Sequence, residues 1–310
     1  MAKEDKILVT GASGMVGNAL REILPTAFFL NSKKYDLRHT HEANYIFARY
    51  QPTHVIHLAA KVGGVKANSE KLGSFYYENI MINTNVLEAA RKFNSKKVLS
   101  LLSTCVYPDS ANYPLTENQI HNGEPHASNY GYAYAKRMLD IQSKAYREQY
   151  GCNFMTIVPN NLFGEYDNFH LEESHLIPAI IRKIYEAKEK GGKVVLWGDG
   201  MALREFTYSK DLAKIIVFLL DEYNECEPIN VGNTNEYTIK EVAETIADIM
   251  SFDGKIIWDE TKPKGQPRKP SDNSKLLSMG WPKNDYTSFR KALENTCTWF
   301  VKNYPNVRGM

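Results

Sequence analysis

The stretch "KILVTGASGMVGNAL", residues 6–20, joins a short apolar run to three regularly spaced glycines. Residues 6–10 have the apolar pattern of a buried β-strand, and Gly11, Gly14 and Gly17 follow directly after it. Glycine permits a tight turn and lets the backbone approach a pyrophosphate, which then lies at the N-terminus of the next helix. The spacing G-x-x-G-x-x-G also suits an ordinary turn between a strand and a helix. Its position after the first strand of an alternating pattern favours a dinucleotide site.

Strands and helices alternate through the first half of the chain. Apolar runs typical of strands lie at residues 27–30, 54–60, 97–103 and 154–163, and a helical pattern covers residues 85–93. Strands that are separated by helices form a parallel sheet, because each helix carries the chain back to the same edge. We therefore predict an α/β protein with a doubly wound parallel Rossmann sheet.

The alternation becomes less regular after residue 164. We predict a dinucleotide-binding Rossmann domain over residues 1–164 and a smaller C-terminal α/β substrate domain over residues 165–310. Residues 207–234 contain a helical pattern and the strand-like run "PINVGN". This segment is expected to return to the first domain.

The composition excludes several classes of protein. The 310 residues are 43% hydrophobic, which is enough for a large core, and the net charge is +2. The cations are dispersed, so nucleic-acid binding is not expected, and no apolar run approaches the ~20 residues of a membrane span. The cysteines form no C-x-x-C pair, which is typical of reduced thiols rather than of disulfides or a zinc site: Cys105, Cys152, Cys226 and Cys297. The N-terminus has no signal-peptide pattern, so we predict a cytoplasmic protein. Because the cysteines have no metal-site spacing, we predict no bound metal.

The segment after the second strand indicates which dinucleotide binds. An NAD site usually places an acidic residue about 20 residues beyond the glycine loop, at the ribose 2′-hydroxyl. Residues 31–34 read Asn-Ser-Lys-Lys and contain no acid. Ser32 and Lys33 suit a 2′-phosphate, so we predict NADP(H) as the cofactor. The alternative is that Lys33 and Lys34 are only residues of a solvated turn, an alternative that is nearly as good for Lys34.

The stretch "NYGYAYAKRML", residues 129–139, places three tyrosines before one lysine. On a helix, Tyr132 shares a face with Lys136 because the two are four residues apart, whereas Tyr134 does not. An ammonium near a phenol favours the phenolate, so we expect Lys136 to lower the pKa of Tyr132 from about 10. The alternative is a tyrosine that packs on a lysine stem. Ser103, at the end of the fourth strand, is expected to share a substrate oxygen with Tyr132, because ligands bind at the carboxyl ends of such strands.

The glycine loop, "HLAA" at residues 57–60, Ser103, Tyr132 and Lys136 together resemble the extended short-chain dehydrogenase/reductase superfamily. The resemblance implies that Tyr132 is the proton donor and acceptor, that Lys136 holds the nicotinamide ribose and lowers the pKa of Tyr132, and that Ser103 orients the substrate oxygen. The cofactor contacts expected in all are Gly11, Ser13, Gly14, Met15, Val16, Gly17, Ser32, Lys33, Asp36, Leu37, Leu101, Leu102, Ser103, Thr104, Lys136, Pro159, Asn160, Asn161, Leu162 and His175.

Longer stretches resemble the GDP-L-fucose synthase family. They are "HLAAKVGGVKAN" (57–68), "STCVYP" (103–108), "HNGEPHASNYGYAYAKRM" (121–138), "DNFHLEESHLIPAIIRK" (167–183), "LWGDGMALREF" (196–206) and "GQPRKPSDNSKL" (265–276). Members of this family use NADPH to epimerise C3 and C5 and to reduce C4 of GDP-4-keto-6-deoxy-D-mannose. One departure is Lys183, which stands where some members have an arginine.

Epimerisation beside a C4 ketone needs a base to remove a proton and an acid to return one on the other face. Both groups need pKa values near 7, which a thiol and an imidazole can reach. The resemblance implies that Cys105 and His175 are this pair. From the residues alone, a small buried side chain is the favoured interpretation of Cys105, and His175 could equally be the cap of the next helix.

The pyrophosphate of a GDP-sugar suits cationic side chains. The expected substrate contacts are Asn161, Lys183, Trp197, Arg204 and Lys269, although Trp197 could instead be a core residue of a strand. The choice of guanine depends on the resemblance alone, which also implies a homodimer through a helical bundle that includes the Tyr132 helix. The alternatives are a sugar-nucleotide 4-epimerase or 4,6-dehydratase of the same superfamily, and a non-catalytic protein that senses NADP(H).

Overall fold

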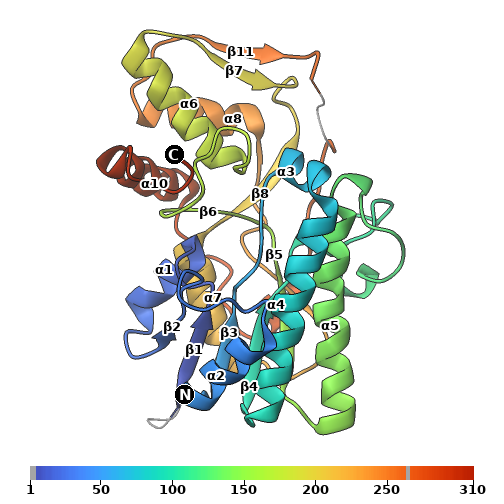
Figure 1. Ribbon diagram of the computed structural model, residues 1–310. Coiled ribbons are helices and arrows are strands. Elements are labelled where there is room, and N and C mark those ends of the chain that lie inside the picture. Colours follow the sequence, from blue (N-terminus) through green and yellow to red (C-terminus); the bar gives the residue numbers. More distant parts are fainter. Residues whose placement is uncertain (1–4, 263–265) are drawn as a thin grey trace.

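In the computed structural model, which describes residues 5–262 and 266–310, a six-stranded parallel sheet forms the centre of the protein (Figure 1). All neighbouring strands are parallel. Their order is β2 (Phe28–Phe29), β1 (Ile7–Thr10), β3 (His54–His57), β4 (Lys97–Leu101), β5 (Phe154–Pro159) and β9 (Ile229–Val231). The chain order reverses between β1 and β3, where ligands of such sheets bind. The predicted doubly wound parallel sheet is confirmed.

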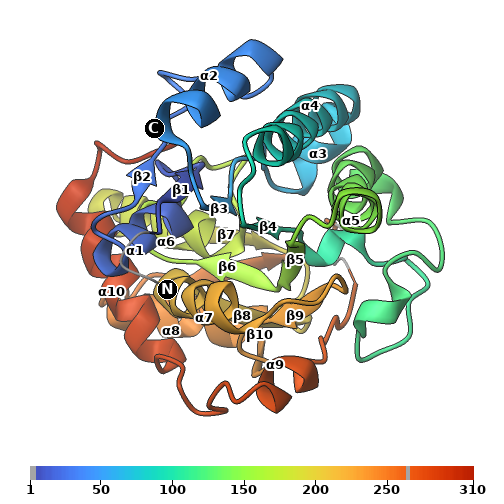
Figure 2. The same cartoon turned by 90° about the horizontal axis from the view of Figure 1, so that it is seen from below.

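Helices cover both faces of this sheet (Figure 2). Val9 and Ile56 pack in one apolar cluster with α1 (Met15–Ile23) and α7 (Ser209–Glu222). Leu8 and Val55 belong to a second cluster, with α2 (Thr40–Tyr50), α4 (Leu72–Lys92) and α5 (Tyr130–Tyr150). Successive residues of a strand point to opposite faces, so a sheet that is buried on both faces has continuously apolar strands.

A second lobe lies beyond the carboxyl ends of the sheet (Figure 1). It contains a three-stranded sheet in the order β10, β8, β6 and a pair of parallel strands, β7 and β11. The bounds are β6 (Asn161–Phe163), β7 (Val194–Trp197), β8 (Leu203–Tyr208), β10 (Glu236–Thr238), β11 (Ile256–Asp259), α6 (Leu176–Lys190), α8 (Ile239–Ile249) and α10 (Phe289–Asn303). Short helices complete the fold: α3 (Val65–Glu70), α9 (Ser274–Ser278) and the 3-10 helices η1 (Thr104–Val106), η2 (Glu117–Gln119) and η3 (Ala127–Asn129).

The strand expected at residues 154–163 is in fact two strands. The chain leaves the main sheet at Asn160, and β6 pairs with β8 in the second lobe. Asn160 is buried, and its side chain bonds Thr207, Glu205 and the backbone oxygen of Asn233. These bonds satisfy the polar side chain of Asn160, which lies between two apolar runs. Sequence periodicity alone does not distinguish two such runs from one long strand.

The helix expected at residues 85–93 is much longer, because α4 begins at Leu72. Its first half contains the buried asparagines Asn79 and Asn83, which interrupt the apolar pattern. Asn79 bonds the backbone of Lys61 and Phe75, and Asn83 bonds His57 and the backbone of α5. Buried polar side chains of this kind are stable only when such partners are present.

Candidate active site

The glycine loop is shaped by close contacts with its surroundings. Gly11 has φ +65°, and a Cβ there would lie 2.7 Å from the Ala59 nitrogen. A Cβ on Gly17 would lie 2.5 Å from the Ala12 Cα, so α1 can pack on the loop only with glycine at this position. Gly14 is the N-cap of α1 and has no capping side chain, so the first N–H groups of the helix remain available. These residues fit the pyrophosphate of a dinucleotide.

The turn after β2 is cationic, and the nearby acid is already paired. Ser32 and Lys33 are exposed, and the Asn31 side chain accepts the Lys33 N–H at 2.8 Å. Asp36 binds Arg38 with a shortest distance of 2.6 Å, and this hydrogen bond lowers the pKa of Asp36 to about 2. The paired carboxylate leaves the turn suited to a phosphate. Arg38 was not singled out by the sequence analysis.

Tyr132 and Lys136 lie on one face of α5, as their spacing predicts. The Lys136 ammonium is 5.9 Å from the centre of the Tyr132 ring, whereas Tyr134 lies 5.4 Å from the Arg137 guanidinium. Tyr132 and Lys136 are both buried, at 9% and 3% exposure. Lys136 Nζ donates to the Leu101 carbonyl at 2.7 Å, which ties α5 to the end of β4.

The expected lowering of the pKa of Tyr132 by Lys136 is wrong for this structure. Burial raises the pKa of Tyr132, and the neighbouring Cys105 acts in the same direction, while the Ser103 hydroxyl acts against them. Burial also lowers the pKa of Lys136 to about 8. The desolvation of both groups favours their neutral forms, and the ammonium is directed at Leu101 rather than at the phenol oxygen.

Ser103 and Cys105 lie at the end of β4, beside Tyr132. The Ser103 hydroxyl accepts the Cys105 N–H at 3.4 Å, and Cys105 packs against the cluster of Tyr132, Phe75 and Ala67. Cys105 is only partly buried, so it is not the fully packed core residue of the alternative interpretation.

The buried Arg137 holds the turn that carries Cys105. Its Nε donates to the Val106 carbonyl at 2.7 Å and its Nη1 to the Gly123 carbonyl at 2.6 Å. The position of the thiol therefore depends on α5, which also carries Tyr132. Sequence reasoning missed Arg137 because an arginine beside a lysine on a helix usually indicates a solvated face.

His175 approaches from the second lobe, as the N-cap of α6. The ring is exposed, but the protein around it lowers its pKa by desolvation, and the charge of Arg308 acts in the same direction. The preceding residues contact the start of α3, where the Gly64 N–H donates to the Glu173 carbonyl at 2.9 Å. Cys105 packs against the cluster to which Ala67 of α3 belongs, so this short helix adjoins the surroundings of Cys105 as well as the His175 loop.

Lys269 lies near Cys105 on one side and near Arg204 on another. Burial lowers the pKa of Lys269, and Cys105 acts in the opposite direction, while Arg204 lowers it further. The segment of Lys269 is fixed by β8, because Glu205 accepts both the N–H and the hydroxyl of Ser271, at 2.8 and 2.5 Å. Lys269 therefore lies within electrostatic range of both the candidate thiol and a second cation, Arg204.

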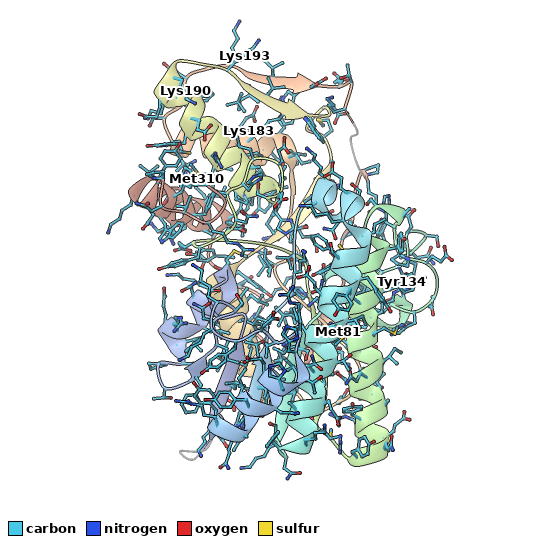
Figure 3. The ribbon with its side chains drawn as sticks, viewed as in Figure 1. Met81, Tyr134, Lys183, Lys190, Lys193 and Met310 are labelled. Carbon is cyan, nitrogen blue, oxygen red and sulfur yellow. The ribbon has the colours of Figure 1, made fainter. Side chains whose placement is uncertain are left out.

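The remaining expected substrate residues lie elsewhere in the second lobe. Lys183, labelled on α6 in Figure 3, donates to the Val195 carbonyl of β7 at 3.0 Å. Trp197 is 58% exposed, so its alternative interpretation as a core residue is wrong. Its ring lies 5.9 Å from the Lys262 ammonium. Asn161 donates to the Glu205 carbonyl at 2.8 Å, which joins β6 to β8.

The sequence analysis missed a buried acid in the second lobe. Asp167 is 6% exposed, and within the described part of the chain its Oδ2 has no hydrogen-bond partner. Burial raises its pKa to about 7, against the N–H of Asn168 and the charge of Arg308. The only signal in the sequence was its place at the start of "DNFH".

Residues 5–262 and 266–310 contain no group of three or more His, Cys, Asp and Glu side chains that could hold a metal ion. Within the same ranges, no helix combines the length and the apolar character that a membrane crossing needs.

Comparisons with known proteins agree with this geometry. Residues 7–232 match the model of the NAD dependent epimerase/dehydratase family. A GDP-L-fucose synthase of Dictyostelium discoideum is 42% identical over 97% of this chain and 97% of that protein. A GDP-L-fucose synthase of Escherichia coli K12 is 35% identical over 100% of both chains. The crystal structure of a GDP-L-fucose synthetase from Naegleria fowleri bound to NADP has a TM-score of 0.93 and 39% identity, covering 99% of this chain and 97% of that one.

The chain therefore belongs to the NAD dependent epimerase/dehydratase family, and within it to the group of the GDP-L-fucose synthases.

Proposed function

We propose that the protein converts GDP-4-keto-6-deoxy-D-mannose to GDP-L-fucose, by epimerisation at C3 and C5 and NADPH-dependent reduction at C4. One observation carries the proposal: a partly exposed thiol, Cys105, lies beside the Ser103, Tyr132 and Lys136 group of a reductase. A reductase needs only the hydroxyl, phenol and ammonium. The thiol supplies a second proton-transfer group at the same site.

NADP(H) fits the residues that surround the glycine loop. Gly11, Gly14 and Gly17 with the first turn of α1 hold the pyrophosphate, and Ser32 and Lys33 hold the 2′-phosphate. When bound, the reduced cofactor supplies the hydride that reduces C4. The other expected contacts lie at the carboxyl ends of two strands: Leu101, Leu102 and Thr104 at and after the end of β4, and Pro159, Asn160 and Leu162 from the end of β5 into β6.

In the reduction, Tyr132 donates a proton to the C4 oxygen. Burial keeps the phenol protonated, which suits a donor. Ser103 orients the oxygen by a hydrogen bond. Lys136 fixes the end of β4 and holds the nicotinamide ribose.

In the epimerisation, Cys105 and His175 act on C3 and C5 from opposite faces of the sugar. One removes the proton beside the ketone and the other returns a proton to the other face. The lowered pKa of His175 keeps its ring neutral at pH 7, so that it can accept a proton. Lys269 and Arg204 bind the nucleotide phosphates beside Cys105, while Lys183, Trp197 and Asn161 extend the substrate site along α6, β7 and β6.

The protein is further proposed to act in the cytoplasm as a homodimer. All four cysteines are free, which suits a reducing compartment. Apolar side chains are exposed on α4 and α5, which lie side by side: Tyr76, Tyr77, Met138 and Ile141. A helical bundle with a second copy would cover them. Light scattering of the purified protein, compared with Ile141→Lys, tests this: a monomer in both cases contradicts the dimer.

Incubation with GDP-4-keto-6-deoxy-D-mannose and NADPH tests the reaction. The proposal expects loss of the absorbance of the reduced nicotinamide and formation of GDP-L-fucose. A 4-epimerase or a 4,6-dehydratase would not consume NADPH in net turnover. A non-catalytic sensor of NADP(H) would bind the cofactor without turnover, and either result would overturn the proposal.

A further inference from the structure

Residues 307–309, here called the 307–309 clasp, lie against the loop that leads to His175. The Phe169 N–H donates to the Arg308 carbonyl at 2.8 Å. Arg182 of α6 closes the contact from the other side, because its Nη1 donates to the carbonyls of Phe169 and Gly309, each at 3.0 Å. Val307 is buried in the same apolar cluster as Phe169. The loop and the clasp are therefore joined by both polar and apolar contacts.

The clasp fits the loop closely. Gly309 has φ +95°, a backbone conformation that residues with a side chain rarely adopt. A Cβ at this position would lie 2.3 Å from Asn168 Oδ1 and 2.4 Å from the His170 nitrogen. Only glycine fits without moving the 168–170 backbone, which lies five to seven residues before His175.

The other side of the same loop rests on α3. The Gly64 N–H donates to the Glu173 carbonyl at 2.9 Å, and a Cβ on Gly64 would lie 2.7 Å from the Ser174 oxygen. Two ion pairs, Lys66 with Glu172 and Lys71 with Glu173, add contacts that are exposed and therefore weak. The loop is thus held between α3, which adjoins the surroundings of Cys105, and the clasp.

The charge of Arg308 also reaches the loop. It acts on the pKa of His175 and on that of the buried Asp167, and it lowers both. The clasp therefore contributes a positive charge as well as backbone contacts.

We propose that Arg308 and Gly309 are positioning residues for His175, holding its loop against α3 so that the imidazole meets the sugar opposite Cys105. The inference depends on the proposed function, because it assigns a role within the epimerisation half of that reaction. It predicts that damage to the clasp slows proton exchange at C3 and C5 but spares hydride transfer at C4. Tyr132, Ser103 and Lys136 have no contact with the clasp among the hydrogen bonds described.

The test compares Gly309→Ala and Arg308→Ala with the matched control Arg290→Ala. Arg290 is an exposed arginine of α10 that pairs with Asp248, far along the chain from the loop. Two rates are measured on each protein: deuterium uptake at C3 and C5 of GDP-4-keto-6-deoxy-D-mannose in heavy water, and oxidation of GDP-L-fucose by NADP+. The second reaction is the reverse of the C4 reduction and needs no inversion.

A displacement of catalytic groups by about 1 Å costs up to roughly 100-fold in rate. We expect Gly309→Ala to lower deuterium uptake by roughly 10- to 100-fold and to leave the oxidation rate within about twofold, with Arg290→Ala unchanged in both. Arg308→Ala keeps the contact of the backbone carbonyl, so its deuterium uptake should fall less than that of Gly309→Ala. Arg308→Lys keeps the positive charge and should recover the rate that Arg308→Ala loses. Equal loss of both rates, or no loss in either clasp variant, would overturn the inference. If the unmodified protein shows neither rate, the proposed function itself fails, which is a separate result.

Discussion

The two halves of the candidate site are built in different ways. The reduction group, Ser103, Tyr132 and Lys136, comes from one helix and the adjoining strand end of a single sheet. The proposed epimerisation pair comes from both lobes: Cys105 on a turn after β4, and His175 on a loop held by α3 and the 307–309 clasp. The first half depends on helix geometry, whereas the second depends on how the lobes pack. The second half should therefore be the more easily disturbed by distant changes.

Desolvation affects both halves in the same direction. It raises the pKa of the buried Tyr132, and it lowers the pKa values of the buried Lys136 and of His175, whose residue is exposed but lies close to surrounding protein. In each case desolvation favours the neutral group. A neutral phenol can donate a proton and a neutral imidazole can accept one, so the same physical effect suits both of the proposed roles.

The largest effect is expected in the reduction half. Tyr132→Phe removes the proton donor, and the rate of C4 reduction should fall by about 10³- to 10⁴-fold, the upper range for a positioned acid. Tyr134→Phe, on the other face of α5, should stay within about twofold. Single-turnover oxidation of NADPH measures both, and circular dichroism checks that both fold. A greater loss in Tyr134→Phe would contradict the helical-face argument.

The next largest effect is expected in the epimerisation half, which one substitution should impair without impairing the reduction half. Cys105→Ser replaces the thiol by a far weaker acid, so deuterium uptake at C3 and C5 should fall by about 10²- to 10⁴-fold. Hydride transfer should survive, because Ser103, Tyr132 and Lys136 are unchanged, and some reduced but uninverted sugar should accumulate. Mass spectrometry of the products in heavy water measures the exchange. Undiminished uptake at both carbons would return Cys105 to a packing role.

A smaller effect concerns the cofactor turn, which lies away from both halves. Lys33→Glu should weaken the binding of NADPH by roughly tenfold and change the binding of NADH little. Only NADPH has the 2′-phosphate that a charge-assisted hydrogen bond to Lys33 would hold. Arg38 stays paired with Asp36 in either case. Fluorescence titration with both cofactors is the measurement, and an equal loss for both would refute the assignment of Lys33.

Local spacing made the fold and the reduction half predictable. The glycines at 11, 14 and 17 follow β1 directly, and the interval from Tyr132 to Lys136 places both on one face whatever the rest of the chain does. The direction of the pKa shift of Tyr132 was not predictable, because it depends on desolvation by residues that are distant in sequence, such as Phe75.

The features that could not be predicted depend on contacts between residues that are distant in the sequence. Arg137 looks like a surface residue in the sequence, yet it holds the turn of Cys105 through the Val106 carbonyl. The role of Gly309 depends on the Asn168 side chain and the His170 backbone, about 140 residues away in the chain. The resemblance to a known family identified His175, but no periodicity could place it relative to Cys105.

The smallest effect on turnover is expected at Asp167, in the second lobe. Its pKa is raised by burial from 3.8 to about 7. As pH rises between these values, the unfolded chain loses this proton while the folded protein keeps it, so the free energy of unfolding falls.

Asp167→Asn removes this dependence and still offers an oxygen to the Asn168 N–H. The variant should thus be the more stable protein at pH 8, by on the order of 1–3 kcal/mol, and nearly equal at pH 4. Urea unfolding at both pH values measures the difference. The turnover at pH 7 should stay within about twofold, since the hydrogen bond that the structure describes for the Asp167 carboxylate is to the Asn168 N–H and not to a proposed catalytic residue. A stability gain that is the same at pH 4 and pH 8 would show that the carboxyl does not titrate in this range, and a large loss of deuterium uptake would instead place Asp167 in the epimerisation half.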